Sequence, residues 1–171
     1  LKERLSLEGF VDDNIRNNKS FTEIQSGVFA TQIIGGNIGE KNYKGFISSD
    51  IEGTCGICHW DETELGKTEY EPFRRQMTAE VSAACEGALA GGCDDILIKD
   101  AHDSARNLLP AELPENIQIF RGWGSDIHSM MSGIDASFAG AIFTGYHSPS
   151  NFDSSPLAHT MNTQNCSITI N

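Results

Sequence analysis

Two short apolar segments with a long helical pattern between them constrain the fold of this chain more than any other feature. The segments are residues 45–49 and 96–98. Between them, apolar side chains recur at spacings of three and four, which is typical of one buried face of a helix. They are Phe73, Met77, Val81, Ala84, Cys85 and Ala88. A strand, a helix and a strand in this order predict a right-handed βαβ unit with parallel strands.

Further apolar segments extend the predicted sheet. Strands are expected within residues 28–34, 117–120, 139–144 and 167–170, and a short helix within 125–132. We therefore predict an α/β fold with a mostly parallel sheet flanked by helices. The 171 residues are enough for one domain with a core. We assign residues 1–43 to a polar amino-terminal extension and residues 44–171 to the α/β domain.

The charge and the apolar content of the chain exclude several classes of partner. The net charge is −12 and no block of Lys or Arg is present, so we expect neither nucleic acid nor an anionic membrane as a partner. No apolar run approaches the ~20 residues that cross a bilayer. The five cysteines are scattered through the sequence, which favours a reducing, cytoplasmic location.

Polar side chains follow three of the predicted strands. Asp50 and Glu52 come after the first, His102 follows the strand at 96–98, and His147 follows the strand at 139–144. Residues i and i+2 of a strand point to the same side, so both carboxylates can reach one point. The carboxyl ends of parallel strands meet at one edge, so we expect the four side chains to converge there. Like charges this close require a positive partner, which is either a metal ion or a Lys or Arg side chain.

The mixture of ligand types predicts which metal would bind. Two carboxylates with two imidazoles suit Zn²⁺, and less exclusively Mn²⁺, Co²⁺ or Fe²⁺. A bridging Asp would permit two ions about 3.5–4 Å apart, an arrangement used in hydrolysis. His159 is a candidate further ligand or acid/base group. His128 lies beside Met130 and Met131, where we expect a packing role.

Residues 55–59, Cys-Gly-Ile-Cys-His, match the attachment motif of a c-type haem. The motif is short, and no axial Met partner is evident. A zinc knuckle would need a second Cys-x-x-Cys, which this chain lacks. We therefore expect Cys55 and Cys58 to lie in a loop beside the metal site, where exposed thiols would be open to oxidation.

Four motifs in this order and spacing resemble the M55 peptidase family of bacterial zinc D-aminopeptidases. They are Ser-Asp-Ile-Glu-Gly at 49–53, Lys-Asp-Ala-His-Asp-Ser at 99–104, the run at 131–147 that ends in Gly-Tyr-His, and Ala-His-Thr-Met at 158–161. The combination is specific although each piece alone is not. The resemblance implies an α/β fold and a metal-activated water at a binuclear zinc site.

The resemblance also implies a role for each site residue. Asp50 would bridge the two zinc ions, and Glu52 and His102 would complete one site. His147 would belong to the other site, and His159 would be the catalytic histidine. The family's remaining ligand is a Glu further downstream, so we expect the metallopeptidase domain at 44–171 to be truncated at its carboxyl end.

The implied activity is an aminopeptidase that acts on short peptides or amino-acid amides, with D-stereochemistry as one alternative. The resemblance implies a ring-shaped homo-oligomer as the assembly. The alternative function is a metal-binding or regulatory protein of the same fold that has lost hydrolysis. A haem protein is the third class.

Overall fold

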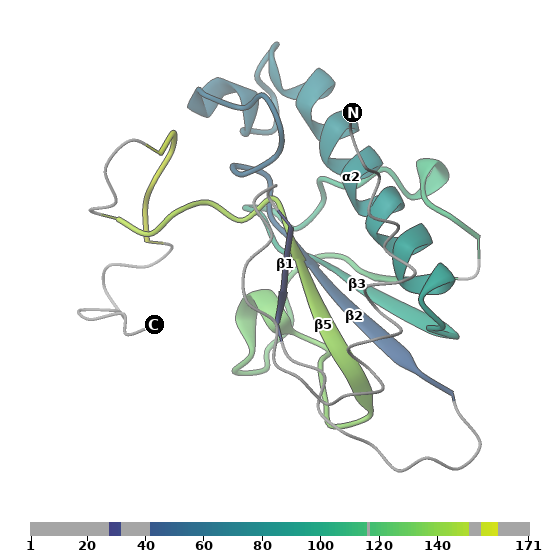
Figure 1. Cartoon of the computed structure of the whole chain (residues 1–171). Helices are drawn as coiled ribbons and strands as arrows, with labels where there is room; N and C mark the ends of the chain where they lie inside the picture. The colour runs from purple at the N-terminus through teal and green to yellow at the C-terminus, as the bar shows by residue number, and fades with distance from the viewer. Residues whose placement is uncertain (1–27, 32–41, 116, 151–154, 161–171) are drawn as a thin grey trace.

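The sheet is built around the predicted βαβ unit. The computed structural model describes residues 28–31, 42–115, 117–150 and 155–160. It contains five strands in the order β1-β5-β2-β3-β4 (Figure 1). Their bounds are Val28–Thr31 for β1, Lys44–Ser49 for β2, Asp95–Asp100 for β3, Gln118–Phe120 for β4 and Phe138–Thr144 for β5. Strands β2 to β5 are parallel and β1 is antiparallel to β5, which confirms a mostly parallel α/β sheet.

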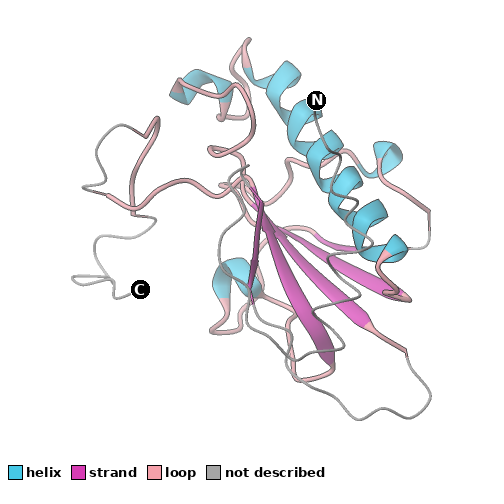
Figure 2. Ribbon diagram, viewed as in Figure 1, coloured by secondary structure: helices cyan, strands magenta, loops and turns pink. Residues whose placement is uncertain are grey.

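Helix α2, Tyr70–Ala90, covers one face of this sheet (Figures 1 and 2). Met77, Val81 and Cys85 are buried on it and pack against Ile47 of β2 and Ile98 of β3. Burying an apolar side chain of this size stabilises the fold by about 1.5–3 kcal/mol. The three buried side chains therefore hold the helix against the sheet. The helix bounds and its apolar face confirm the prediction from the spacing of three and four. Within the described ranges, no helix has the length and apolar character to cross a bilayer.

The loop between β4 and β5 covers part of the opposite face. The Ser48 hydroxyl on β2 contacts the Met130 carbonyl at 2.7 Å and the Tyr146 hydroxyl at 2.6 Å. Lys99 of β3 is fully buried on this face, with its ammonium 4.6 Å from the ring centroid of Phe120 and 4.7 Å from that of Trp123. Aromatic faces attract cations, which offsets part of the cost of burying this charge.

The predicted helix at 125–132 is wrong in extent, because only a 3₁₀ turn at Ser129–Met131 forms. The Asp126 carboxylate accepts the backbone N–H of His128 and the hydroxyl of Ser132, which competes with helical hydrogen bonding. His128 is exposed at the start of this turn, so the expected packing role is also wrong.

The other predicted strands are found where the structure describes them. The segment at 117–120 forms β4, and part of the segment at 28–34 forms β1. The predicted strand at 167–170 and Cys166 lie outside the described residues. Among the described cysteines, all four are free thiols. They are Cys55 and Cys58, which are exposed, Cys85, which is buried, and Cys93, which is half-buried.

Candidate metal centre

The two carboxylates lie in the turn that follows β2, because the strand ends at Ser49. The strand-alternation argument for Asp50 and Glu52 is therefore wrong in detail, although both side chains reach the same imidazole of His102. The backbone N–H of Asp50 still donates to the Thr144 carbonyl of β5 at 2.9 Å. The next N–H, that of Ile51, donates to the Asp50 carboxylate at 2.9 Å, so the chain turns away from the sheet at this point.

Two glycines allow the turns after β2 and β5 to touch. Gly53 donates its N–H to the Gly145 carbonyl at 2.8 Å. A Cβ on Gly145 would lie 2.2 Å from the Asp50 carbonyl oxygen, and a Cβ on Gly53 would lie 2.2 Å from the Tyr146 carbonyl oxygen. Gly145 also has a φ of +64°, a conformation that L side chains rarely adopt. This contact holds the Asp50 turn beside the segment that carries His147.

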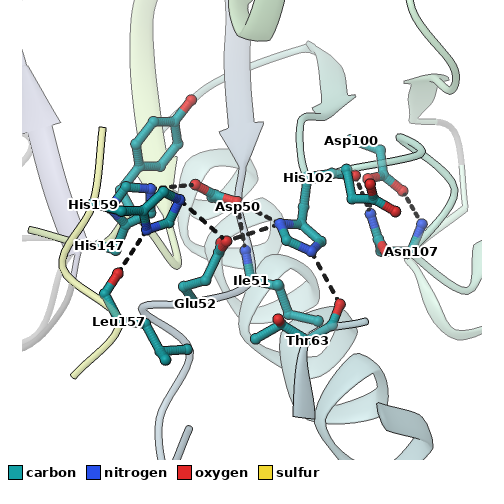
Figure 3. Close-up of polar contacts among 12 residues, drawn as sticks. Asp50, Ile51, Glu52, Thr63, Asp100, His102, Asn107, His147, Leu157 and His159 are labelled. Atoms are coloured by element: carbon teal, nitrogen blue, oxygen red, sulfur yellow. Dashed lines mark hydrogen bonds and ion pairs between the residues drawn. The ribbon is translucent and has the colours of Figure 1, made fainter. Parts of the chain in front are cut away.

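His102, just past the end of β3, faces both carboxylates (Figure 3). Its Nδ1 lies 3.2 Å from Asp50 Oδ1 and 3.1 Å from Glu52 Oε2. Its Nε2–H donates to the Thr63 carbonyl at 3.0 Å. A backbone carbonyl can only accept, so this bond requires a proton on Nε2 and directs Nδ1 at the carboxylates.

His147 and His159 approach the same carboxylates from the other side. His147 Nε2 is 3.7 Å from Asp50 Oδ2, and His159 Nε2 is 3.6 Å from Glu52 Oε1. The two imidazoles are stacked, with ring centroids 3.6 Å apart. Each donates its Nδ1–H to a backbone carbonyl, that of Ser148 at 2.9 Å for His147 and that of Leu157 at 2.6 Å for His159. In both rings Nε2 is therefore left to face the carboxylates.

Burial and hydrogen bonding shift the pKa values of the three innermost groups. Burial raises the pKa of Asp50 to about 7, with a contribution from the charge of Glu52. Burial also acts to raise the pKa of Glu52, but hydrogen bonds to His102 and Asp50 outweigh it and lower this pKa to about 2. Burial acts to lower the pKa of His102, but hydrogen bonds to both carboxylates raise it to about 10. One imidazolium thus faces two carboxylates. A divalent cation between the two carboxylates would supply the remaining positive charge.

The donor atoms of this cluster fit a metal ion. They form two groups within which the candidate ligand atoms lie within 4.8 Å of one another. One group contains Asp50, Glu52 and His102, and the other contains Glu52, His147 and His159. Glu52 Oε2 is buried and shares His102 Nδ1 with Asp50, at 3.1 Å from Glu52 Oε2 and 3.2 Å from Asp50 Oδ1. One N–H cannot satisfy two buried carboxylates, so a metal cation would offset the remaining cost of burial, and mixed nitrogen and oxygen ligands suit Zn²⁺.

A buried network supports the loop that carries His102. The Asp100 carboxylate accepts the backbone N–H groups of Asn107 and Leu108 at 2.6 and 2.8 Å and the Asn107 side-chain amide at 2.9 Å. The same amide donates to the His102 carbonyl at 2.7 Å, and the Tyr70 hydroxyl donates to Asn107 at 2.7 Å. These bonds tie the His102 backbone to β3 and to the start of α2. Asp100 and Asn107 are therefore positioning residues; the sequence motif at 99–104 contains Asp100 without explaining it, and Asn107 lies outside that motif.

The Cys-Gly-Ile-Cys-His motif has a local structural role. The backbone N–H groups of Cys58 and His59 donate to the Glu62 carboxylate at 2.7 and 2.8 Å, and His59 Nδ1 accepts the Asp61 N–H at 3.2 Å. These bonds form a capping box at the start of the 3₁₀ turn Trp60–Glu62. The turn leads directly to Thr63, whose carbonyl accepts from His102. Sequence reasoning missed Thr63, because a backbone acceptor has no signature in the residue type.

Comparison with known proteins gives the family of this chain. The chain is 34% identical over 104 residues to a D-aminopeptidase of Bacillus subtilis (strain 168), a match that covers 60% of this chain and 37% of the relative. It also resembles the solved structure of Zn-dependent D-aminopeptidase DppA from Bacillus subtilis, a self-compartmentalizing protease, with a TM-score of 0.65 and 31% identity. That likeness covers 70% of this chain and 43% of the DppA chain, so this chain spans less than half the length of either relative. Residues 43–171 match the Peptidase_M55 model, described as D-aminopeptidase, and the chain therefore belongs to the M55 peptidase family.

Proposed function

We propose that the carboxylate and imidazole cluster is a binuclear zinc centre, and that the chain is an aminopeptidase that hydrolyses short peptides or amino-acid amides. One observation carries the proposal. Asp50 and Glu52 are buried together between imidazoles from two other segments, with one imidazolium to balance two carboxylates. Membership of the M55 family and the zinc dependence of the related DppA support the same chemistry.

Asp50 is the best candidate to bridge two metal ions. Its Oδ1 faces His102 Nδ1 at 3.2 Å, while its Oδ2 faces His147 Nε2 at 3.7 Å. The two oxygens of one carboxylate are thus directed at imidazoles on opposite sides. We assign Glu52 and His102 to one ion and His147 to the other. Manganese or cobalt could occupy the same nitrogen and oxygen ligands.

Zinc bound at this cluster would polarise the scissile carbonyl and lower the pKa of a water molecule so that it can attack. The chain's own residues would supply proton transfer and orientation. The His159 side chain is 29% exposed, compared with 10% for His102 and 12% for His147, so it is the imidazole most open to substrate. Its Nδ1–H is held by the Leu157 carbonyl, which leaves Nε2 free to accept a proton. We assign His159 the acid/base role.

The His159 assignment is tested by the His159→Asn variant. We expect it to keep its zinc and to lose turnover by about 10²–10⁴-fold, the usual contribution of a general acid/base. The assay is hydrolysis of D- and L-alanine p-nitroanilide by zinc-loaded protein, with metal content measured on the same samples. His128→Asn is the matched control, because His128 is exposed and lies outside both ligand groups. Loss of zinc from His159→Asn would make His159 a metal ligand, as its grouping with Glu52 and His147 permits.

The remaining parts of the proposal concern substrate stereochemistry, assembly and location. The related proteins are D-aminopeptidases, so we propose that D-configured substrates are preferred. DppA is a self-compartmentalizing protease, and we propose a ring-shaped homo-oligomer for this chain as well. We further propose that residues 44–171 carry the metallopeptidase domain and that the protein acts in the cytoplasm.

A further inference from the structure

Trp60 is a large aromatic side chain that lies at the protein surface beside the candidate metal centre. Its side chain lies outside the buried core, and the residue is 42% exposed. The indole contacts the centre through His159, with ring centroids 5.0 Å apart and the planes at 65°. His159 is in turn stacked on His147. An indole, an imidazole and a second imidazole thus follow one another from the protein surface to the carboxylates.

The backbone of Trp60 is fixed relative to the proposed metal ligands. Its carbonyl accepts both the N–H and the hydroxyl of Thr63, each at 2.9 Å. The Thr63 carbonyl accepts from His102 Nε2. The same short turn therefore positions His102 through the hydrogen bond to the Thr63 carbonyl. It also contacts His159 through the indole ring of Trp60.

The acidic residues of this turn are already engaged by other groups, so the surface that the turn offers beside His159 is the indole ring. The Asp61 carboxylate pairs with Lys67 at 2.9 Å. The Glu62 carboxylate accepts the N–H groups of Cys58 and His59.

From this arrangement we propose that Trp60 determines specificity by packing against the apolar side chain of the residue released from the substrate's amino end. The inference rests on the proposed function and names the substrate class, which is amides and short peptides that begin with an apolar residue. An exposed indole gains contact area when such a side chain covers it, whereas glycine offers nothing to cover it.

The test compares p-nitroanilides of glycine, alanine, leucine and phenylalanine, in the configuration that the zinc-loaded protein prefers. We expect Trp60→Ala to lower the leucine-to-glycine ratio of kcat/KM by about 10-fold or more, mainly through KM, because a hydrophobic contact of this size discriminates to that degree. Trp60→Phe should restore most of the ratio. Leu89→Ala is the control, because Leu89 is also exposed but lies near the far end of α2, and it should leave the ratio unchanged. An equal loss on all four substrates would mean that Trp60 only supports His159, and would overturn the proposal.

A binding measurement separates this inference from the proposed hydrolysis. The chain has two tryptophans, so Trp123→Phe leaves Trp60 as the fluorescent indole. Titration of this zinc-loaded variant with leucine should give a saturable change in emission, and titration with glycine should not. If the protein hydrolyses none of the anilides, the proposed function fails, yet a leucine-specific emission change would still support the contact. Absence of that change would overturn the role of Trp60 whether or not hydrolysis occurs.

Discussion

At the scale of single residues, the chemistry of the centre depends on which nitrogen of each imidazole is free. His102, His147 and His159 each donate one ring N–H to a backbone carbonyl, at 3.0, 2.9 and 2.6 Å respectively. The other nitrogen of each ring faces Asp50 or Glu52. These carbonyls orient all three rings for their proposed roles. At His102 the nitrogen that faces the carboxylates carries a proton in the metal-free protein, and a metal ion would displace it.

The sequence supplied the identities of these residues but not their arrangement. Strand-end positions pointed to Asp50, Glu52, His102 and His147, because carboxyl ends of parallel strands share an edge. His159 directly follows none of the predicted strands, so this argument does not reach it. The carbonyls that orient the rings, and the indole of Trp60, could not be predicted, because they depend on the path of turns and not on a periodic pattern.

The cysteines give a residue-scale prediction about reactivity. Burial raises the pKa of the Cys85 thiol to about 12, whereas Cys55 and Cys58 are exposed. A raised pKa removes thiolate, the reactive form, so at pH 8 we expect iodoacetamide to label Cys55 and Cys58 on the order of 10³-fold faster than Cys85. Peptide mapping by mass spectrometry measures the rates, with protein unfolded in guanidinium as the control in which the difference disappears. Equal labelling of Cys85 and Cys58 in the folded protein would contradict the packing of α2.

At the scale of elements, α2 and the strands that the structure describes were predictable, and the turns were not. The apolar spacing from Phe73 to Ala88 located the helix, since a buried face leaves a periodic pattern in the sequence. The loop from β4 to β5 follows no period. Its 3₁₀ turn depends on Asp126, whose side-chain hydrogen bonds replaced the expected short helix.

The contact between the turns after β2 and β5 gives a prediction about stability. Gly145→Ala would place a methyl group against the Asp50 carbonyl and force an L side chain into a positive φ. We expect it to lower the free energy of unfolding by at least about 2 kcal/mol. Urea denaturation of metal-free protein is the appropriate measurement, because bound zinc would add its own stabilisation.

Gly92→Ala is the control for backbone strain alone. Gly92 has a φ of +96°, and a Cβ there would meet nothing within 4 Å. This variant should therefore be destabilised only by the strain of an L residue at positive φ, which costs about 1–2 kcal/mol. If Gly145→Ala is no more destabilised than Gly92→Ala, the close approach of the two turns does not contribute to stability.

At the scale of the whole molecule, the order β5-β2-β3 brings the three site-bearing strands side by side. The strand, helix and strand pattern predicted that β2 and β3 would be neighbours, because right-handed crossovers join adjacent parallel strands. The antiparallel pairing of β1 with β5 was not predicted. These strands are distant in sequence, and no periodic signal specifies such a partner.

The proposed homo-oligomer gives a prediction about assembly. A net charge of −12 makes copies of the chain repel one another, and salt screens this repulsion. We expect light scattering after size exclusion to give a mass that is a multiple of that of one chain, with assembly weaker at ~10 mM than at ~150 mM salt. A monomer at every salt concentration would contradict the proposed ring.

The central claim is that Asp50 joins two zinc ions, and zinc content per chain tests it most directly. Elemental analysis of protein purified without chelator should give about two zinc ions per chain. Asp50→Asn keeps the shape of the side chain but removes its charge, and it should lose most of this zinc. Asp103→Asn makes the same change on an exposed residue next to His102 and should keep the wild-type content. Wild-type protein without zinc, or Asp50→Asn protein with its zinc intact, would contradict the proposed centre.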